Sequence, residues 1–132
     1  MPDVNWIAVL LCGISSMVLG AIWYSPLLFA KRWMTGAKLS EQDLAGANMG
    51  LIYGTAFLLS VIAALALAIF LGRGMPLGPA ISAGAATGIC FVSASFGISY
   101  LFERRSIAHW LINGGYHAIQ FTLFGLILGL MP

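Results

Sequence analysis

Residues 44–72 read LAGANMGLIYGTAFLLSVIAALALAIFLG and contain no charged side chain. A helix needs about 20 mainly apolar residues to cross the hydrocarbon core of a bilayer, so this stretch is long enough to span it. Three further uncharged runs occupy residues 4–30, 74–102 and 106–132. Together the runs predict an all-α integral membrane protein, a bundle of four spanning helices. The predicted spans are approximately 4–27, 48–71, 77–102 and 107–130.

The composition agrees with a membrane domain. Hydrophobic residues make up 61% of the chain and charged residues 8%, whereas soluble globular domains carry about 25% charge. We therefore expect residues 1–132 to form a single transmembrane domain whose surroundings are the lipid bilayer. The first run is not expected to be a cleaved signal peptide, because no basic residue precedes it. A net charge of +2 gives no reason to expect nucleic acid as a partner.

The basic residues are concentrated in two of the three connections between spans. The middle connection contains only Arg73, whereas the first and third connections contain Lys31, Arg32, Lys38, Arg104 and Arg105. Short loops rich in Lys and Arg stay in the cytoplasm. The asymmetry predicts two helical hairpins, with both hairpin loops cytoplasmic and with the N- and C-termini outside.

Aromatic residues and a proline mark the cytoplasmic end of the first span. Trp23, Tyr24 and Trp33 lie near the basic residues, and their amphipathic rings favour the membrane interface. Pro26 lacks an amide hydrogen and disfavours helix at the residue before it. We expect the first helix to end or kink there.

Two membrane exits resemble each other. Residues 27–32 read LLFAKR, and residues 100–105 read YLFERR. Duplication of a hairpin and independent selection for interfacial anchoring explain the likeness equally well. Within the second exit, Glu103 lies beside Arg104 and Arg105, so ion pairing or solvation is the expected role of its carboxylate.

The connection between the first two spans is the only one long enough to form structure of its own. Ser40 is followed three residues later by Asp43, a pattern that caps the start of a helix. We expect a helix to start near Glu41 and to run on into the membrane.

Small residues at helical spacing recur in all four spans. In lipid, such residues let helix backbones approach closely and so promote helix association. The sets are Gly13, Ser16 and Gly20; Gly46, Gly50 and Gly54; Ala80, Gly84 and Gly88; and Gly125 with Gly129. Packing within one bundle is the first interpretation. Four such faces exceed what a minimal bundle needs, so a homo-oligomer or a partner membrane subunit is also expected.

The fourth span carries polar side chains near its middle. Asn113, Tyr116, His117 and Gln120 are three or four residues apart and so share one helical face. Polar groups are costly in hydrocarbon and should face other helices, water or a ligand. Hydrogen bonding across the bundle is the first interpretation, and a polar pocket or path is the alternative. No Asp or Glu lies within any span, which disfavours a proton pump.

Four short segments match the pattern of one family: NWIAV at 5–9, WYSPLLF at 23–29, FERRS at 102–106 and LINGGYH at 111–117. On these segments the chain resembles the small, mostly bacterial membrane proteins catalogued as domain of unknown function 1761, over close to its full length. The resemblance implies four spans and location in the bacterial cytoplasmic membrane. It supplies no activity, substrate or catalytic residue.

Three hypotheses for function follow. No nucleotide loop, metal cluster or catalytic triad is recognisable, so we expect no catalytic residue, no metal and no cofactor. The first hypothesis is a non-catalytic membrane subunit that self-assembles or serves a partner through small-residue helix contacts. The second is a channel or transporter for small solutes or ions, with its path along the polar face of the fourth span. The third, an enzyme acting on lipid, has only Tyr116, His117 and Glu103 to offer and is ranked last.

Overall fold

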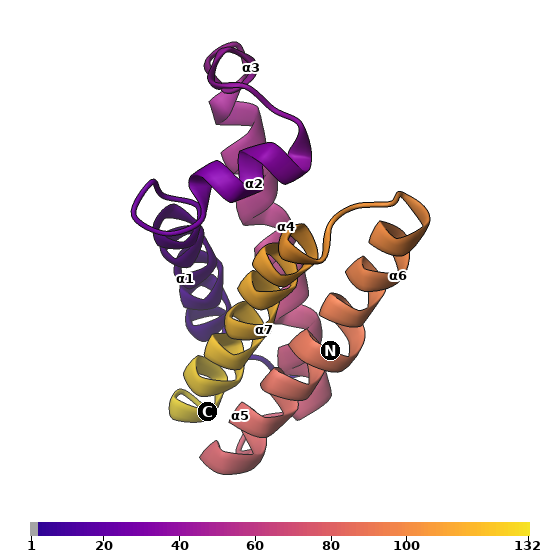
Figure 1. Cartoon of the computed structure of the whole chain (residues 1–132). Helices are drawn as coiled ribbons and strands as arrows, with labels where there is room; N and C mark the ends of the chain where they lie inside the picture. The colour runs from indigo at the N-terminus through magenta and orange to yellow at the C-terminus, as the bar shows by residue number, and fades with distance from the viewer. Residues whose placement is uncertain (1–2) are drawn as a thin grey trace.

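The structure, a computed structural model, describes residues 3–132 and is 80% helical, without strands in that range. Its elements are α1 (Trp6–Trp23), α2 (Ala30–Ala37), α3 (Glu41–Ala45), α4 (Met49–Leu71), α5 (Leu77–Ala86), the π-helix η1 (Thr87–Ser93), α6 (Ala94–Phe102) and α7 (Ile107–Leu130) (Figure 1). Since α5, η1 and α6 follow without a break, four helices are long and apolar enough to cross a membrane. The all-helical, membrane-compatible part of the predicted fold is confirmed.

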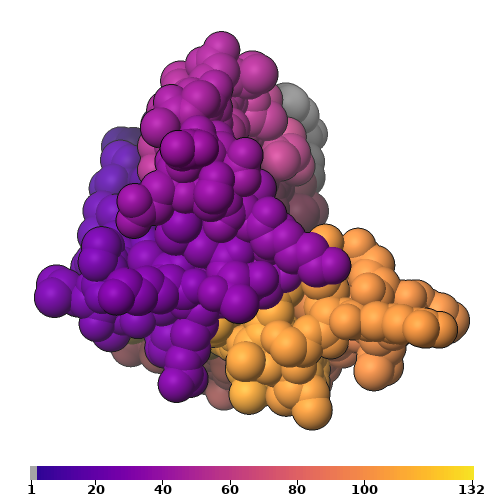
Figure 2. Space-filling view, turned by 45° about the horizontal axis from the view of Figure 1, so that its top comes forward, coloured from indigo at the N-terminus to yellow at the C-terminus, as the bar shows by residue number. Residues whose placement is uncertain are grey.

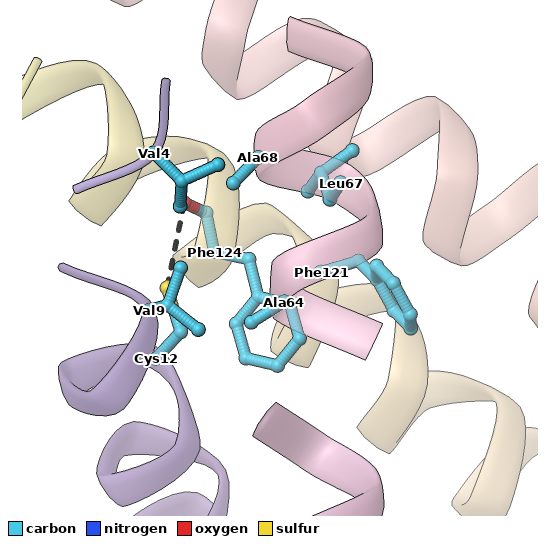
Figure 3. Close-up of a cluster of buried hydrophobic side chains, with 8 residues drawn as sticks. All are labelled: Val4, Val9, Cys12, Ala64, Leu67, Ala68, Phe121 and Phe124. Carbon is cyan, nitrogen blue, oxygen red and sulfur yellow. Dashed lines mark hydrogen bonds between the residues drawn. The ribbon is translucent and has the colours of Figure 1, made fainter. Parts of the chain in front are cut away.

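Helix α7 is central to the arrangement. It contacts α1 on one side and the continuous α5, η1 and α6 on another, while α4 packs mainly against α1 (Figure 1). Apolar residues of α1, α4 and α7, with Val4, form the buried core shown in Figure 3, which consists of Val4, Val9, Cys12, Ala64, Leu67, Ala68, Phe121 and Phe124. Within it, the Cys12 thiol lies 3.9 Å from the Phe124 carbonyl oxygen, to which it donates.

The first helix ends where its proline predicts a break. The side chain of Asn5 caps its start by accepting from the Ala8 amide, and the helix ends at Trp23, four residues before the end of the predicted span. Two hydrogen-bonded turns then redirect the chain, as the amides of Leu28 and Phe29 bond to the carbonyls of Ser25 and Trp23. The chain continues as the short helix α2.

The predicted cap at Ser40 is confirmed, but the predicted continuous helix is wrong. The Ser40 hydroxyl accepts from the Asp43 amide, and the Asp43 carboxylate accepts from the Ser40 amide. Helix α3 nevertheless ends after one turn at Gly46, and α4 starts afresh at Met49. The Asn48 side chain caps this second start by accepting from the Leu51 amide. Asn is favoured at such caps because its side chain bonds readily to nearby backbone amides.

Hydrogen bonds tie together the segments at each end of the bundle. At one end Arg73 bonds to the Asp3 carboxylate at 2.9 Å and to the Pro132 carbonyl at 3.1 Å. At the other end Arg105 donates to the carbonyl of Gly36 in α2, at 2.8 Å. The turn of residues 72–76 therefore lies beside both ends of the described chain, and α2 lies beside the connection of residues 103–106 (Figure 1).

Glycines bring α5 and η1 against the backbone of α7. A Cβ atom added to Gly84 would overlap the Phe121 carbonyl oxygen, and one added to Gly88 would lie 2.7 Å from the carbonyl oxygen of His117. In the π-helix the backbone bonds span five residues, so a residue five positions beyond Gly88 returns to the same face. Ser93 is that residue, and its hydroxyl donates to the Gly114 carbonyl of α7 at 2.6 Å.

Candidate functional site

The predicted polar face of α7 turns toward α1 at its deeper end. The Gln120 amide nitrogen donates to the Ser16 hydroxyl at 2.8 Å, and the Tyr116 hydroxyl donates to the Ser16 carbonyl at 2.9 Å. Gln120 also bonds through its side-chain oxygen to His117 Nδ1, at 2.7 Å. Ser16 and Gln120 are 1% and 5% exposed. Ser16, predicted as a packing residue, is thus also a hydrogen-bonding partner of the polar face.

Asn113 connects the polar face to two tyrosines nearer the basic end. Its side-chain oxygen accepts from the Tyr24 hydroxyl at 2.7 Å, and its nitrogen donates to the Tyr100 hydroxyl at 2.8 Å. The same nitrogen lies 3.3 Å from His109 Nε2. Both oxygen and nitrogen of the amide are therefore used, and α1, α6 and α7 meet at this side chain.

Sequence reasoning missed His109 as a member of this network. It lies four residues before Asn113, which puts it on the same face of α7, so the spacing that defined the face could have included it. His109 is 5% exposed, and its Nδ1 lacks a hydrogen-bond partner among the described residues. The ring packs on Gly36, where an added Cβ would overlap the imidazole.

Aromatic rings enclose the imidazole of His117. It stacks on Phe96 with ring centroids 5.0 Å apart and planes 10° apart, and it meets the Tyr116 ring edge-on at 4.9 Å. Tyr116 in turn packs on Tyr24, with centroids 5.5 Å apart. This aromatic contact links the Asn113 group to the Gln120 group along α7. The resulting network pairs donors with acceptors in the partly buried interior of the bundle.

Two tryptophans also direct their ring nitrogens into the bundle. Trp23 donates to the Ile112 carbonyl at 2.8 Å, and Trp110 donates to the Ser93 carbonyl at the same distance. The second bond satisfies a carbonyl at the end of the π-helix, where the regular α-helical pattern of bonds is interrupted. Trp23 was predicted as an interfacial anchor, and the structure adds a hydrogen bond between helices to that position.

Most of the predicted packing residues lie in contacts between helices. Added Cβ atoms at Gly84, Gly88, Gly125 and Gly129 would all meet the facing helix, and Ala80, which is fully buried, contacts Gly125 and Gly129. On α1, a Cβ at Gly13 would lie 2.7 Å from Val61 of α4, and one at Gly20 would lie 3.7 Å from the Tyr116 ring. These residues form two close interfaces, α5 and η1 with α7, and α1 with its neighbours.

The predicted glycine set of the second span is the exception. Gly46 is the C-cap of α3, so it does not lie on the spanning helix, because the chain breaks between α3 and α4. A Cβ at Gly54 would meet nothing within 4 Å, and one at Gly50 would meet only the side chain of Asn48. Among residues 3–132, this set therefore makes no contact with a facing helix.

The predicted interfacial residues gather at the end of the bundle that contains α2. Trp33 of α2 packs on Tyr24 at 5.5 Å between ring centroids, and Pro26 lies in the turn between α1 and α2. Arg105 lies 4.0 Å from Glu103. Arg104 adopts a left-handed backbone, with φ of 58°. No group of three or more His, Cys, Asp or Glu that could hold a metal occurs within residues 3–132.

Four long apolar helices and a partly buried polar network define a multi-pass helical protein of membrane-compatible architecture. The chain belongs to the family described as protein of unknown function, DUF1761, whose pattern it matches over residues 7–129. The predicted family is thereby confirmed. Comparisons with curated proteins and with solved structures found no match.

Proposed function

We propose that the protein is a non-catalytic subunit of the bacterial cytoplasmic membrane that assembles with further copies of itself through the first half of α4. The single observation that carries the proposal is the open space beside Gly50 and Gly54. In lipid, two helices associate where small residues let their backbones approach, and a pair spaced by four residues is a recurrent pattern at such contacts. The same type of contact is already filled elsewhere in this bundle, at Gly84 and Gly125.

The surroundings of these glycines support the proposal. Side chains beside them face away from the rest of the chain, with Leu51 65% and Tyr53 58% exposed. Phe57 and Val61, further along the helix, lie against Gly13 of α1. Residues 49–55 are all exposed, so the first two turns of α4 can pack on a second copy.

The proposal includes the orientation of the subunit. Five of the six basic residues lie at the end that contains α2 and the 103–106 connection, and such residues remain in the cytoplasm. The turn at Arg73 and both termini would then face outward. Two hairpins, formed by α1 with α4 and by α5 to α6 with α7, would each place their connection in the cytoplasm.

Subunit counting tests the assembly. Protein extracted with its surrounding lipid should give a defined homo-oligomer in native mass spectrometry, and Gly54→Leu should shift it to monomer. Gly78→Leu is the matched control, because a Cβ at Gly78 also meets nothing within 4 Å. Gly84→Leu is unsuitable, since it would overlap the backbone of α7. A monomeric wild-type protein, or an oligomer that survives Gly54→Leu, contradicts the proposal.

A second candidate is a path for small solutes or ions along α7. One observation favours it: Asn113, Tyr116, His117 and Gln120 follow one another along the helix within a single polar network. Liposome flux that falls in His117→Ala, in a variant that retains its helical circular dichroism, would support this candidate. Equal flux through wild-type and His117→Ala liposomes would count against it.

A further inference from the structure

The charged ends of the similar sequences 27–32 and 100–105 line one groove. The groove lies between α2 and the 103–106 connection and has a volume of about 760 Å³. Figure 2 views this end of the molecule, where the purple α2 segment meets the orange segment that follows α6. The Arg105 bond to the Gly36 carbonyl at 2.8 Å holds the C-terminal end of α2 beside the 103–106 connection.

The groove is strongly basic. Five of the six Lys and Arg residues of the chain line it, and one acidic residue lines it as well. The charged lining residues are Lys31, Arg32, Lys38, Arg104, Arg105 and the acidic Glu103. Glu103 lies 4.0 Å from Arg105, so it offsets only that cation. Within residues 3–132, the side chains of the other four form no ion pair or hydrogen bond. Four cations therefore converge on an open site that a multivalent anionic group would stabilise.

Two of these cations occupy strained backbone positions. Lys38 and Arg104 have φ of 59° and 58°, and within residues 3–132 they are the only non-glycine residues with positive φ. Glycine is the favoured residue for this conformation, particularly after a helix, as at Lys38 at the end of α2. The chain thus has long basic side chains where the backbone favours glycine, and both positions line the groove.

Exposed apolar side chains lie directly beside the cations in the chain. Leu27 is 92% exposed before Lys31, and Leu101 and Phe102 are 79% and 86% exposed before Arg104. Cations next to exposed apolar residues match the two parts of a phospholipid, the anionic headgroup and the acyl chains. A soluble anion would use only the first part.

We propose that the groove between α2 and the 103–106 connection binds the headgroup of an anionic phospholipid, whose acyl chains lie along the exposed residues at 101–102. The phosphate accepts from Arg32 and Arg104, which approach from the two sides of the groove, while Lys31 and Lys38 add positive charge. Arg105 acts by holding the two sides together through its bond to Gly36. The proposal is independent of assembly through α4.

Lipid retention measured by native mass spectrometry tests the proposal. The protein in zwitterionic detergent is titrated with short-chain phosphatidylglycerol, with phosphatidylcholine of the same chains, and with inorganic phosphate. We expect saturation at one phosphatidylglycerol per protomer. Arg32→Gln should weaken this binding roughly fivefold, and Arg32→Gln with Arg104→Gln roughly twenty-five-fold, because each basic residue near a membrane surface contributes on the order of a fivefold change in affinity.

Arg73→Gln is the matched control, because it removes the same charge at the opposite end of the bundle. It should leave phosphatidylglycerol binding within about twofold of the wild type. Binding that falls equally in Arg73→Gln, or that persists in the Arg32 and Arg104 double variant, overturns the site. Inorganic phosphate that displaces the lipid at similar concentration shows that a soluble anion is the ligand, and phosphatidylcholine that binds equally shows that the charges play no part. Either result overturns the lipid assignment.

Discussion

The contact between α5 and α7 offers the sharpest test of the packing, through Gly84→Ala. The added methyl carbon would overlap the Phe121 carbonyl oxygen and lie 3.1 Å from the Gly125 amide nitrogen. Both neighbours are backbone atoms, so no side chain can swing away. To recover the 3.4 Å of an ordinary contact, the two helices must separate by roughly an ångström.

The separation determines the size of the effect. A gap of about 0.5–1 Å removes a quarter to a half of the dispersion energy of each contact along the interface, and overpacking costs about 1–3 kcal/mol in general. Alanine favours helix over glycine by about 0.5–1 kcal/mol, which offsets part of this loss. We expect Gly84→Ala to lower the free energy of unfolding by about 1–2 kcal/mol.

Unfolding by a denaturing detergent in mixed micelles, followed through the fluorescence of the four tryptophans, measures this free energy. Gly78→Ala is the control, since its methyl group meets nothing within 4 Å, and it should be neutral or slightly stabilising. Gly125→Ala meets the Ala80 carbonyl from the other side of the same contact. The double variant with Gly84→Ala should lose less than the sum, because helices already separated accommodate both methyl groups. Equal stability of Gly84→Ala and Gly78→Ala would refute the reasoning.

Two further predictions concern hydrogen bonds. Asn113→Leu should destabilise the bundle by about 1–3 kcal/mol, because it leaves the Tyr24 and Tyr100 hydroxyls without their partner. Unfolding in denaturing detergent measures this loss. An unchanged free energy of unfolding would mean that water or other groups replace the amide. Hydrogen bonds from the Ser40 amide and, to a smaller extent, from the Ser40 side chain lower the pKa of the Asp43 carboxyl below its ordinary 3.8. The stabilisation from this cap is therefore complete above pH 3.8 and is lost as the pH falls through the lowered pKa. In NMR titration Ser40→Ala should move the Asp43 midpoint upward toward 3.8, and an unchanged midpoint would contradict the cap's role.

The sequence determined the membrane architecture because hydrophobic length is a local property. Uncharged runs of about 20 residues or more must be helical in lipid, where backbone groups can bond only within the segment or to neighbouring protein. The end of α1 before Pro26 and the cap at Ser40 are also local, since they depend on residues within one turn. The break at Gly46 was missed because glycine and Asn48 are compatible both with a continuing helix and with a new start.

Tertiary structure decided which of the equivalent patterns in the sequence are used. Spacing alone gave Gly50 and Gly54 the same role as Gly84 and Gly88, yet only the second pair meets a facing helix, because contact depends on the rotation of each helix about its axis. The same holds for the polar network, in which Tyr24 joins Asn113 from a position 89 residues earlier in the chain. From the sequence, duplication of a hairpin and independent selection for interfacial anchoring explained the likeness between residues 27–32 and 100–105 equally well. Folding places the charged ends of the two segments, residues 31–32 and 103–105, around a single groove.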